Sequence, residues 1–350
     1  MAALFAALPL LAVPLTAQDA RQTLTGREVA VFNVAGEVRV EAGSGSDVTV
    51  DITRGGRDAS KLRVAVDEIR GRRTLRVVYP DDDIVYRGGR DDRWGNSSSE
   101  FRINDDGTWG DRWSGRGRRV RVKSSGSGIE AWADLVIRVP AGKTLAVYQG
   151  VGQVTATDVD ADLRLDAASA RISANGIKGA LTIDGGSGGV EVRNMSGPSL
   201  SVDNGSGGVT VNDVRSDRCS IDTGSGGVRG AGVECQSLTV DVGSGSVRLD
   251  GVRAAEVSVD AGSGSVDVAM LRAPRSVMVD AGSGGVTLAL PEGTGADVDI
   301  STGSGGISSD FPVRTKRVER GELRGTLGDG GGRIRIETGS GSVRLRKSMR

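Results

Sequence analysis

Residues 200–211 read LSVDNGSGGVTV, and the same pattern returns as CSIDTGSGGVRG (219–230), LTVDVGSGSVRL (238–249) and VSVDAGSGSVDV (257–268). The interval is 19 residues each time. On both sides of each Gly-Ser-Gly step, apolar and polar residues alternate, which is typical of two half-buried strands joined at a corner. A fixed period of this length predicts a stacked array in which each repeat forms one coil.

The repeat extends well beyond these four copies. The motif starts at Gly186, Gly205, Gly224, Gly243, Gly262, Gly282, Gly303 and Gly339. The last three gaps widen to 20, 21 and 36 residues. We therefore expect an all-β protein, a single-stranded parallel β-solenoid of about 19 residues per coil, right-handed as parallel crossovers usually are. The corner glycines are expected to supply positive φ angles.

Four segments follow from this pattern. We expect a signal peptide at 1–17, N-terminal solenoid coils at 18–79, a flexible polar insert at 80–128 and the main solenoid at 129–350. The signal is predicted from the apolar run Leu4–Leu15 and a cleavage zone ending at Ala17. No other stretch approaches the roughly 20 apolar residues of a membrane helix, so no transmembrane span is expected.

Composition narrows the range of functions. The chain has no histidine, which excludes Ser-His-Asp triads and histidine metal sites. Lys+Arg and Asp+Glu number 45 each, so no basic excess favours nucleic acid as a partner.

The insert at 80–128 carries both charge signs and three of the four tryptophans, Trp94, Trp109 and Trp113. Long polar loops are either disordered or functional. Exposed tryptophans could stack on a sugar face, so these three are the candidate ligand-binding residues. Residues 104–111 also resemble a calcium loop, although the glutamate expected at the twelfth position is missing.

Stacking would align one aspartate from each coil. These residues are Asp166, Asp184, Asp203, Asp222, Asp241, Asp260 and Asp280. Carboxylates one strand spacing apart repel by about 0.9 kcal/mol even in water. The favoured interpretation is that each caps the backbone of its own Gly-Ser-Gly corner, with no cofactor required. The alternative is a column of Ca²⁺ ions bridging the last six of these aspartates.

Three other features have more than one interpretation. Thr182, Ser201, Ser220, Thr239 and Ser258 form a hydroxyl column beside the aspartates. Arg215, Arg253 and Arg272 recur at one position, as a partner-facing stripe or a solvated face. Cys219 and Cys235 are either a disulfide in an oxidising compartment or two buried thiols.

Two further stretches, ADLVIRVPAGKTL (133–145) and GRIRIETGSGSVRL (332–345), together with the repeats, resemble one family. It is the bacterial β-strand-repeat family of unknown function labelled "putative adhesin", similar to auto-transporter adhesin head domains. The resemblance covers nearly the whole chain after the signal. It implies a β-solenoid in an exported or envelope location, and it transfers no catalytic residue.

The sequence therefore favours a non-enzymatic exported scaffold or adhesion-type binding module, in the periplasm or on the cell surface. A surface glycan or an envelope protein is the expected partner. The alternatives are a polysaccharide-active β-helix enzyme, which would need a groove built by the insert, and a calcium-stabilised structural array.

Overall fold

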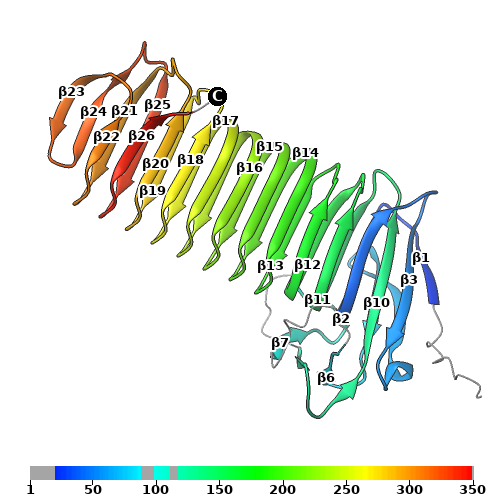
Figure 1. Cartoon of the computed structure of the whole chain (residues 1–350). Coiled ribbons are helices and arrows are strands. Elements are labelled where there is room, and N and C mark those ends of the chain that lie inside the picture. Colours follow the sequence, from blue (N-terminus) through cyan, green and yellow to red (C-terminus); the bar gives the residue numbers. More distant parts are fainter. Residues whose placement is uncertain (1–19, 88–97, 111–116, 349–350) are drawn as a thin grey trace, which may run out of the picture.

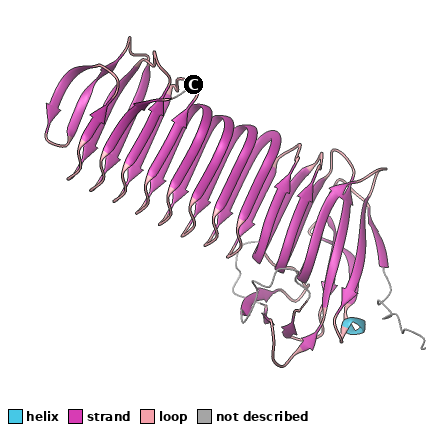
Figure 2. Ribbon diagram, viewed as in Figure 1, coloured by secondary structure: helices cyan, strands magenta, loops and turns pink. Residues whose placement is uncertain are grey.

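The computed structural model describes residues 20–87, 98–110 and 117–348, which form a long stack of β-strands (Figure 1). Figure 2 shows strands throughout these residues and one short helical turn, η1 (Ala59–Lys61). The strands are β1 (Ala20–Leu24), β2 (Glu28–Ala42), β3 (Val48–Gly55), β4 (Arg63–Ile69), β5 (Arg72–Val78), β6 (Asp83–Val85), β7 (Ser98–Ile103), β8 (Arg118–Lys123), β9 (Ile129–Glu130), β10 (Trp132–Val139), β11 (Thr144–Thr157), β12 (Asp162–Asn175), β13 (Leu181–Gly185), β14 (Val190–Asn204), β15 (Val209–Thr223), β16 (Val228–Val242), β17 (Val247–Ala261), β18 (Val266–Met270), β19 (Ser276–Ala281), β20 (Val286–Leu290), β21 (Ala296–Thr302), β22 (Ile307–Ser309), β23 (Val313–Glu319), β24 (Glu322–Leu327), β25 (Gly332–Thr338) and β26 (Val343–Lys347).

The central coils confirm the predicted solenoid. Strands β14 to β17 pair parallel and in register, so that Leu200 lies beside Cys219, Leu238 and Val257 in turn. Each of these strands has 15 residues and bends partway along, and a four-residue corner leads to the next coil (Figure 1). The right-handedness of the solenoid stays a prediction.

The core lies inside the bent strands. In β15 the inward side chains are buried and the intervening ones face outward. The five apolar residues buried in this coil are Val209, Val211, Val214, Cys219 and Ile221. The alternation read from the sequence therefore identifies the inward positions of this coil.

The corner glycines have a different role from the one expected. No Gly-Ser-Gly corner from Gly186 to Gly284 has a positive φ. Instead, a Cβ on Gly207 would lie 1.9 Å from the carbonyl oxygen of Gly188 in the preceding coil, and one on Gly226 would lie 2.0 Å from that of Gly207. The glycines are needed because successive corners stack in direct backbone contact. The next position has more room, because the nearest backbone oxygen to a Cβ would be 3.6 Å away at Gly208 and 3.0 Å away at Gly227. Serine stands at this position in Ser246 and Ser265.

Positive φ values occur instead at the opposite bend of the coil. Asn194, Asp213, Gly232 and Gly251 occupy equivalent places and have φ between 50° and 70°. Glycine, asparagine and aspartate tolerate this left-handed conformation best. The sequence signal was a column of these three residue types spaced 19 apart.

The N-terminal end is built differently from the coils expected at 18–79. Of the described strands in this range, β2 forms a full coil in parallel register with β11, and β5 pairs in parallel with the first part of β2. Strand β3 runs antiparallel to β10 and β1, and β4 forms an antiparallel hairpin with β5. The prediction of further coils here is wrong because alternation identifies a strand without giving its direction.

The insert is more ordered than predicted wherever the structure describes it. Strands β6, β7, β8 and β9 form a separate four-stranded sheet in the order β7-β8-β6-β9. It lies beside the first coils, near β11 and β12 (Figure 1). Val120, Val122, Ile84 and Ile129 from this sheet are buried. The expectation of a loose loop is therefore wrong for these strands.

The C-terminal end explains the 36-residue gap. Strand β25 pairs in parallel with both β19 and β21, so the last coil in sequence lies between two earlier ones. The intervening residues form the hairpin of β23 and β24, and β24 pairs antiparallel with β21. This hairpin covers the end of the stack.

Two adjacent glycines test the stacking constraint. Gly207→Ala should lower the free energy of unfolding by about 1–3 kcal/mol or more, because the new methyl group overlaps a backbone oxygen. Gly208→Ala is the matched control, since the nearest atom to its Cβ would be 3.6 Å away. Chemical denaturation should show a large loss in the first variant and little change in the second. Equal losses would contradict the contact.

Candidate functional site

The predicted aspartate column is confirmed by the strand register. Successive residues pair across the coils from Asp166 through Asp280. The predicted hydroxyl column lies two residues before it along the same strands. Six carboxylates of the column are exposed: Asp184, Asp203, Asp222, Asp241, Asp260 and Asp280. This exposed set is called the acidic column below.

The acidic column does not cap the corners, so the favoured interpretation is wrong. Where the residue after an acid is polar, its side chain binds the corner instead: the Asn204 amide donates a hydrogen bond to the Gly207 carbonyl, and the Thr223 hydroxyl accepts one from the Gly226 amide at 3.2 Å. Thr338, which follows Glu337, accepts one from the Gly341 amide at the same distance. Strand alternation explains this, because the aspartate faces outward and its successor faces the corner. The described residues provide no hydrogen bond or ion pair to the acidic column.

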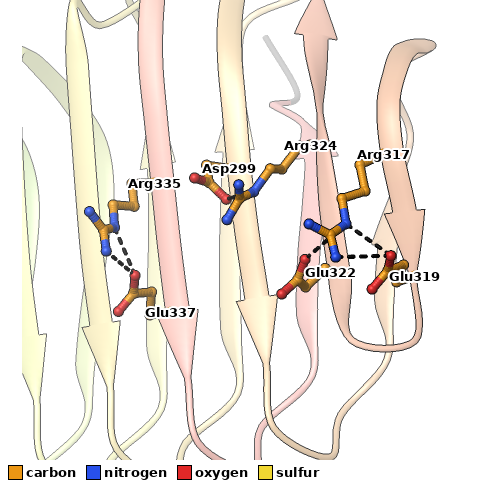
Figure 3. A network of polar contacts seen from close by, with 7 residues as sticks. All are labelled: Asp299, Arg317, Glu319, Glu322, Arg324, Arg335 and Glu337. Carbon is orange, nitrogen blue, oxygen red and sulfur yellow. Dashed lines mark hydrogen bonds and ion pairs between the residues drawn. The ribbon is translucent and has the colours of Figure 1, made fainter.

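The column changes character at its two ends. Asp166 is buried and lies 3.8 Å from the Arg164 guanidinium. Beyond Asp280 the next member is Glu337, which forms an ion pair with Arg335. Figure 3 shows this pair beside two more, in which Arg324 binds Asp299 at 3.0 Å and Arg317 binds Glu319 and Glu322. Arginines therefore neutralise the column only where it ends.

Partial burial and repulsion between neighbouring carboxylates raise the pKa of three members of the acidic column. Partial removal from water raises the pKa of Asp222, and the neighbouring Asp203 and Asp241 raise it further. The pKa values of Asp203 and Asp260 are raised for the same two reasons. Within 20–87, 98–110 and 117–348, no three metal-ligating side chains converge. The calcium ladder stays a prediction.

The tryptophans have a different outcome from the one expected. Trp94 and Trp113 lie outside the described residues. Trp109 is only 7% exposed and packs edge-on against Phe32 at 5.1 Å and beside Phe101 at 5.6 Å. Its ring therefore cannot stack on a sugar and instead attaches the insert to the solenoid.

The surface that receives Trp109 was visible in the sequence. Phe32 stacks on Tyr148 with ring centres 4.2 Å apart. These two residues pair with each other and then with Asp166, so they occupy the place that aspartate holds in later coils. Aromatic residues at an outward-facing position indicate that something covers it.

A hollow of about 450 Å³ lies near the bend opposite the Gly-Ser-Gly corners. Its small lining residues Gly197, Ser216 and Cys235 occupy equivalent positions on successive coils. The three arginines predicted to share a position, Arg215, Arg253 and Arg272, also line it. This hollow is called the arginine groove below.

Only one of the three arginines in the groove forms an ion pair within the described residues. Arg215 forms an ion pair with Glu234 at 3.3 Å. Arg253 and Arg272 have no acidic partner in the part of the chain that the structure describes. Two guanidinium groups are therefore left with their hydrogen-bonding capacity open to solvent.

The two cysteines form a disulfide between adjacent coils. Cys219 belongs to β15 and Cys235 to β16, and both side chains are buried. The bond therefore links the coil interior to the lining of the arginine groove.

The comparisons concern the fold and the family. The family model described as Toastrack DUF4097 matches residues 27–346. A solved structure described as a "putative cell adhesion protein", from Clostridium sporogenes, matches 94% of this chain and 100% of its own, with 9% identity and a TM-score of 0.23. Among curated proteins, none matches this chain. A kinship to auto-transporter adhesin heads stays a prediction.

Removing one charge from the acidic column should stabilise the protein. At pH 7, Asp222→Asn should raise the free energy of unfolding by about 0.5–1 kcal/mol by removing repulsion from two neighbours. The pKa of Asp222 is higher in the folded state than the ordinary value of 3.8, so the wild-type protein takes up a proton on folding as the pH falls toward that value. Protonation removes the repulsion, and the wild type becomes more stable relative to the variant. The advantage of the variant should therefore shrink on acidification.

Asp51→Asn is the control for this measurement, because its effect on the free energy of unfolding should have the opposite sign. Hydrogen bonds from Arg21 and Arg138 lower the pKa of Asp51, so this carboxylate stabilises the fold above its unfolded pKa and loses that effect in acid. Its amide variant should be less stable at pH 7. A stabilised Asp51→Asn, or a destabilised Asp222→Asn, would contradict these assignments.

Loss of the disulfide should destabilise the fold. It closes a loop with a sequence separation of 16, for which the chain-entropy model gives about 3 kcal/mol. The Cys219→Ser/Cys235→Ser variant should therefore melt at a lower temperature than the oxidised wild type. Dithiothreitol should lower the melting temperature of the wild type and leave that of the variant unchanged. An equal response in both proteins would argue against the bond.

Proposed function

The chain belongs to the Toastrack DUF4097 family, a family of unknown function, and from this premise we propose that it is an exported, non-catalytic scaffold of the bacterial envelope that acts as an adhesion-type binding module. Its partner is a surface glycan or an envelope protein.

The architecture supports a scaffold. Coils in uniform register repeat the same outward positions along the stack, so the surface is extended and regular. Antiparallel pairing closes both ends, through β3 and the β4–β5 hairpin at one and the β23–β24 hairpin at the other. End caps of this kind prevent a solenoid from joining end to end. The surface available to a partner is then the side of the stack.

The observation that carries the proposal is the arginine groove. Other arginines on this surface form ion pairs with carboxylates, as Arg248 does with Asp267 and Arg275 with Glu256. Arg253 and Arg272 instead line a hollow without an acidic partner in the described ranges. Charges that do not stabilise the fold are available for an external ligand.

Export is supported by the cysteine chemistry. Structural disulfides persist in oxidising compartments and are rare in the cytosol, and Cys219 is bonded to Cys235. The predicted signal at 1–17 lies outside the described residues. Among the residues that are described, none forms a helix long and apolar enough to cross a membrane.

A fractionation experiment tests the proposal. The full chain, expressed in a bacterial host, should be recovered outside the cytoplasm, lacking residues 1–17 by mass spectrometry and with its disulfide formed. The purified protein should then co-sediment with isolated bacterial envelopes in a saturable manner, because an adhesion-type module has a finite number of partners.

The control is the same protein sedimented without envelopes. Treating the envelopes with periodate or with protease distinguishes a glycan from a protein partner. A cytoplasmic protein with reduced cysteines would overturn export, and the absence of saturable sedimentation would overturn the binding role.

A further inference from the structure

We propose that the arginine groove binds an acidic polysaccharide in which charged and neutral sugars alternate. The site takes carboxylate groups on Arg253 and Arg272 and sugar hydroxyls on the polar side chains between the arginines. This inference rests on the proposed binding function and specifies its ligand and its place.

The groove lies where the repeat is interrupted. The interval from Gly262 to Gly282 is 20 residues rather than 19. The register between β17 and β18 shifts after Leu249, and regular pairing resumes only at Glu256 with Ser276. Residues 271–275 form a loop held by two backbone hydrogen bonds of 2.8 Å, from Leu271 to Val252 and from Arg275 to Ala255.

This interruption changes what Arg253 faces. In the regular coils an outward side chain at this position lies directly beside its equivalent in the next strand, as Arg215 lies beside Glu234. In the strand register, Arg253 lies opposite Glu234 of β16, without an ion pair between them. On its other side, toward β18, no partner residue lies in register with Arg253. Arg272 belongs to the loop that replaces this partner, so the two arginines lie at one end of the groove.

The lining leaves room for a ligand. Three of the lining residues, Gly197, Ser216 and Cys235, are successive members of one column, and each has a small side chain. Cys235 is also held by its bond to Cys219, so this part of the lining is fixed in position.

The charges select an anion with planar acidic groups. Glu234 is already engaged by Arg215 at 3.3 Å, which leaves Arg253 and Arg272 as the available cations. A guanidinium binds a carboxylate through two parallel hydrogen bonds, which fixes orientation as well as charge. Uronic acids carry such carboxylates at regular intervals along a chain.

The same lining disfavours a polyphosphate. Asp217 and Glu234 line the groove together with the arginines, and their carboxylates would repel a ligand with a charge on every unit. They can instead accept hydrogen bonds from sugar hydroxyls, and Ser196 and Gln236 add further polar groups. The groove also lacks the aromatic rings on which single-stranded nucleic acids stack. A ligand with alternating charge and hydroxyls fits best.

The test measures binding of oligosaccharides of alternating glucuronic acid and N-acetylglucosamine by calorimetry. The full protein should bind them, and added salt should weaken binding. Arg253→Ala/Arg272→Ala should raise Kd by at least about tenfold, since two charge-assisted contacts are lost. Arg229→Ala/Arg344→Ala is the matched control: it removes two exposed arginines outside the groove and should change Kd less than about twofold.

Three results would overturn the inference. These are no binding by the wild type, an unchanged Kd in the groove variant, and an equal loss in both variants, which would indicate nonspecific attraction.

Tighter binding of linear polyphosphate than of the oligosaccharide would show that the groove binds another class of ligand. Melting temperatures of both variants equal to that of the wild type exclude misfolding. Envelope sedimentation that persists without oligosaccharide binding would leave the proposed function standing while this ligand fails.

Discussion

Backbone-to-backbone contact at the Gly-Ser-Gly corners is the constraint on which the rest of this structure depends. The carbonyl oxygen of one corner occupies the space in which the next corner would place a Cβ, as Gly188 does for Gly207 and Gly207 does for Gly226. Coils that approach this closely cannot shift relative to one another without a clash. The contact therefore sets the register, and the register determines which side chains share a column.

Uniform register has both a benefit and a cost. It completes the core, since every inward Val, Leu or Ile meets its equivalents above and below. It also brings like charges together, as in the acidic column, where three members have a raised pKa. Six unpaired carboxylates persist because the stacking contacts outweigh repulsion of about 0.9 kcal/mol per neighbour in water. The arginine groove arises where the register is interrupted. One additional residue in the coil after Gly262 shifts the register between β17 and β18, so Arg253 and Arg272 no longer lie side by side on neighbouring strands.

The features that depend on the repeat period could be predicted from the sequence. Alternation gave the inward residues, and the 19-residue interval gave the columns. What it missed depends on contacts between segments far apart in the chain. The same alternation in Val48, Val50 and Ile52 fits a parallel coil and the antiparallel β3 equally well. Trp109 was expected to be exposed because its local sequence is polar, yet Phe32, 77 residues away in the sequence, packs against its ring. The corner glycines were assigned a local role, whereas their partner atoms belong to the preceding coil.

The position of the last coil has a consequence for how the molecule is completed. Among the described residues, the parallel neighbour of β21 is β25 and that of β22 is β26, and no other strand pairs with either in parallel. Residues 296–309 are therefore synthesised before the strands that connect them to the stack exist. During folding their apolar side chains stay uncovered on that side until residues 332–347 pair with them. A chain that lacks residues 332–347 would leave β19 and β20 with one open sheet edge, and an open edge favours pairing with another chain.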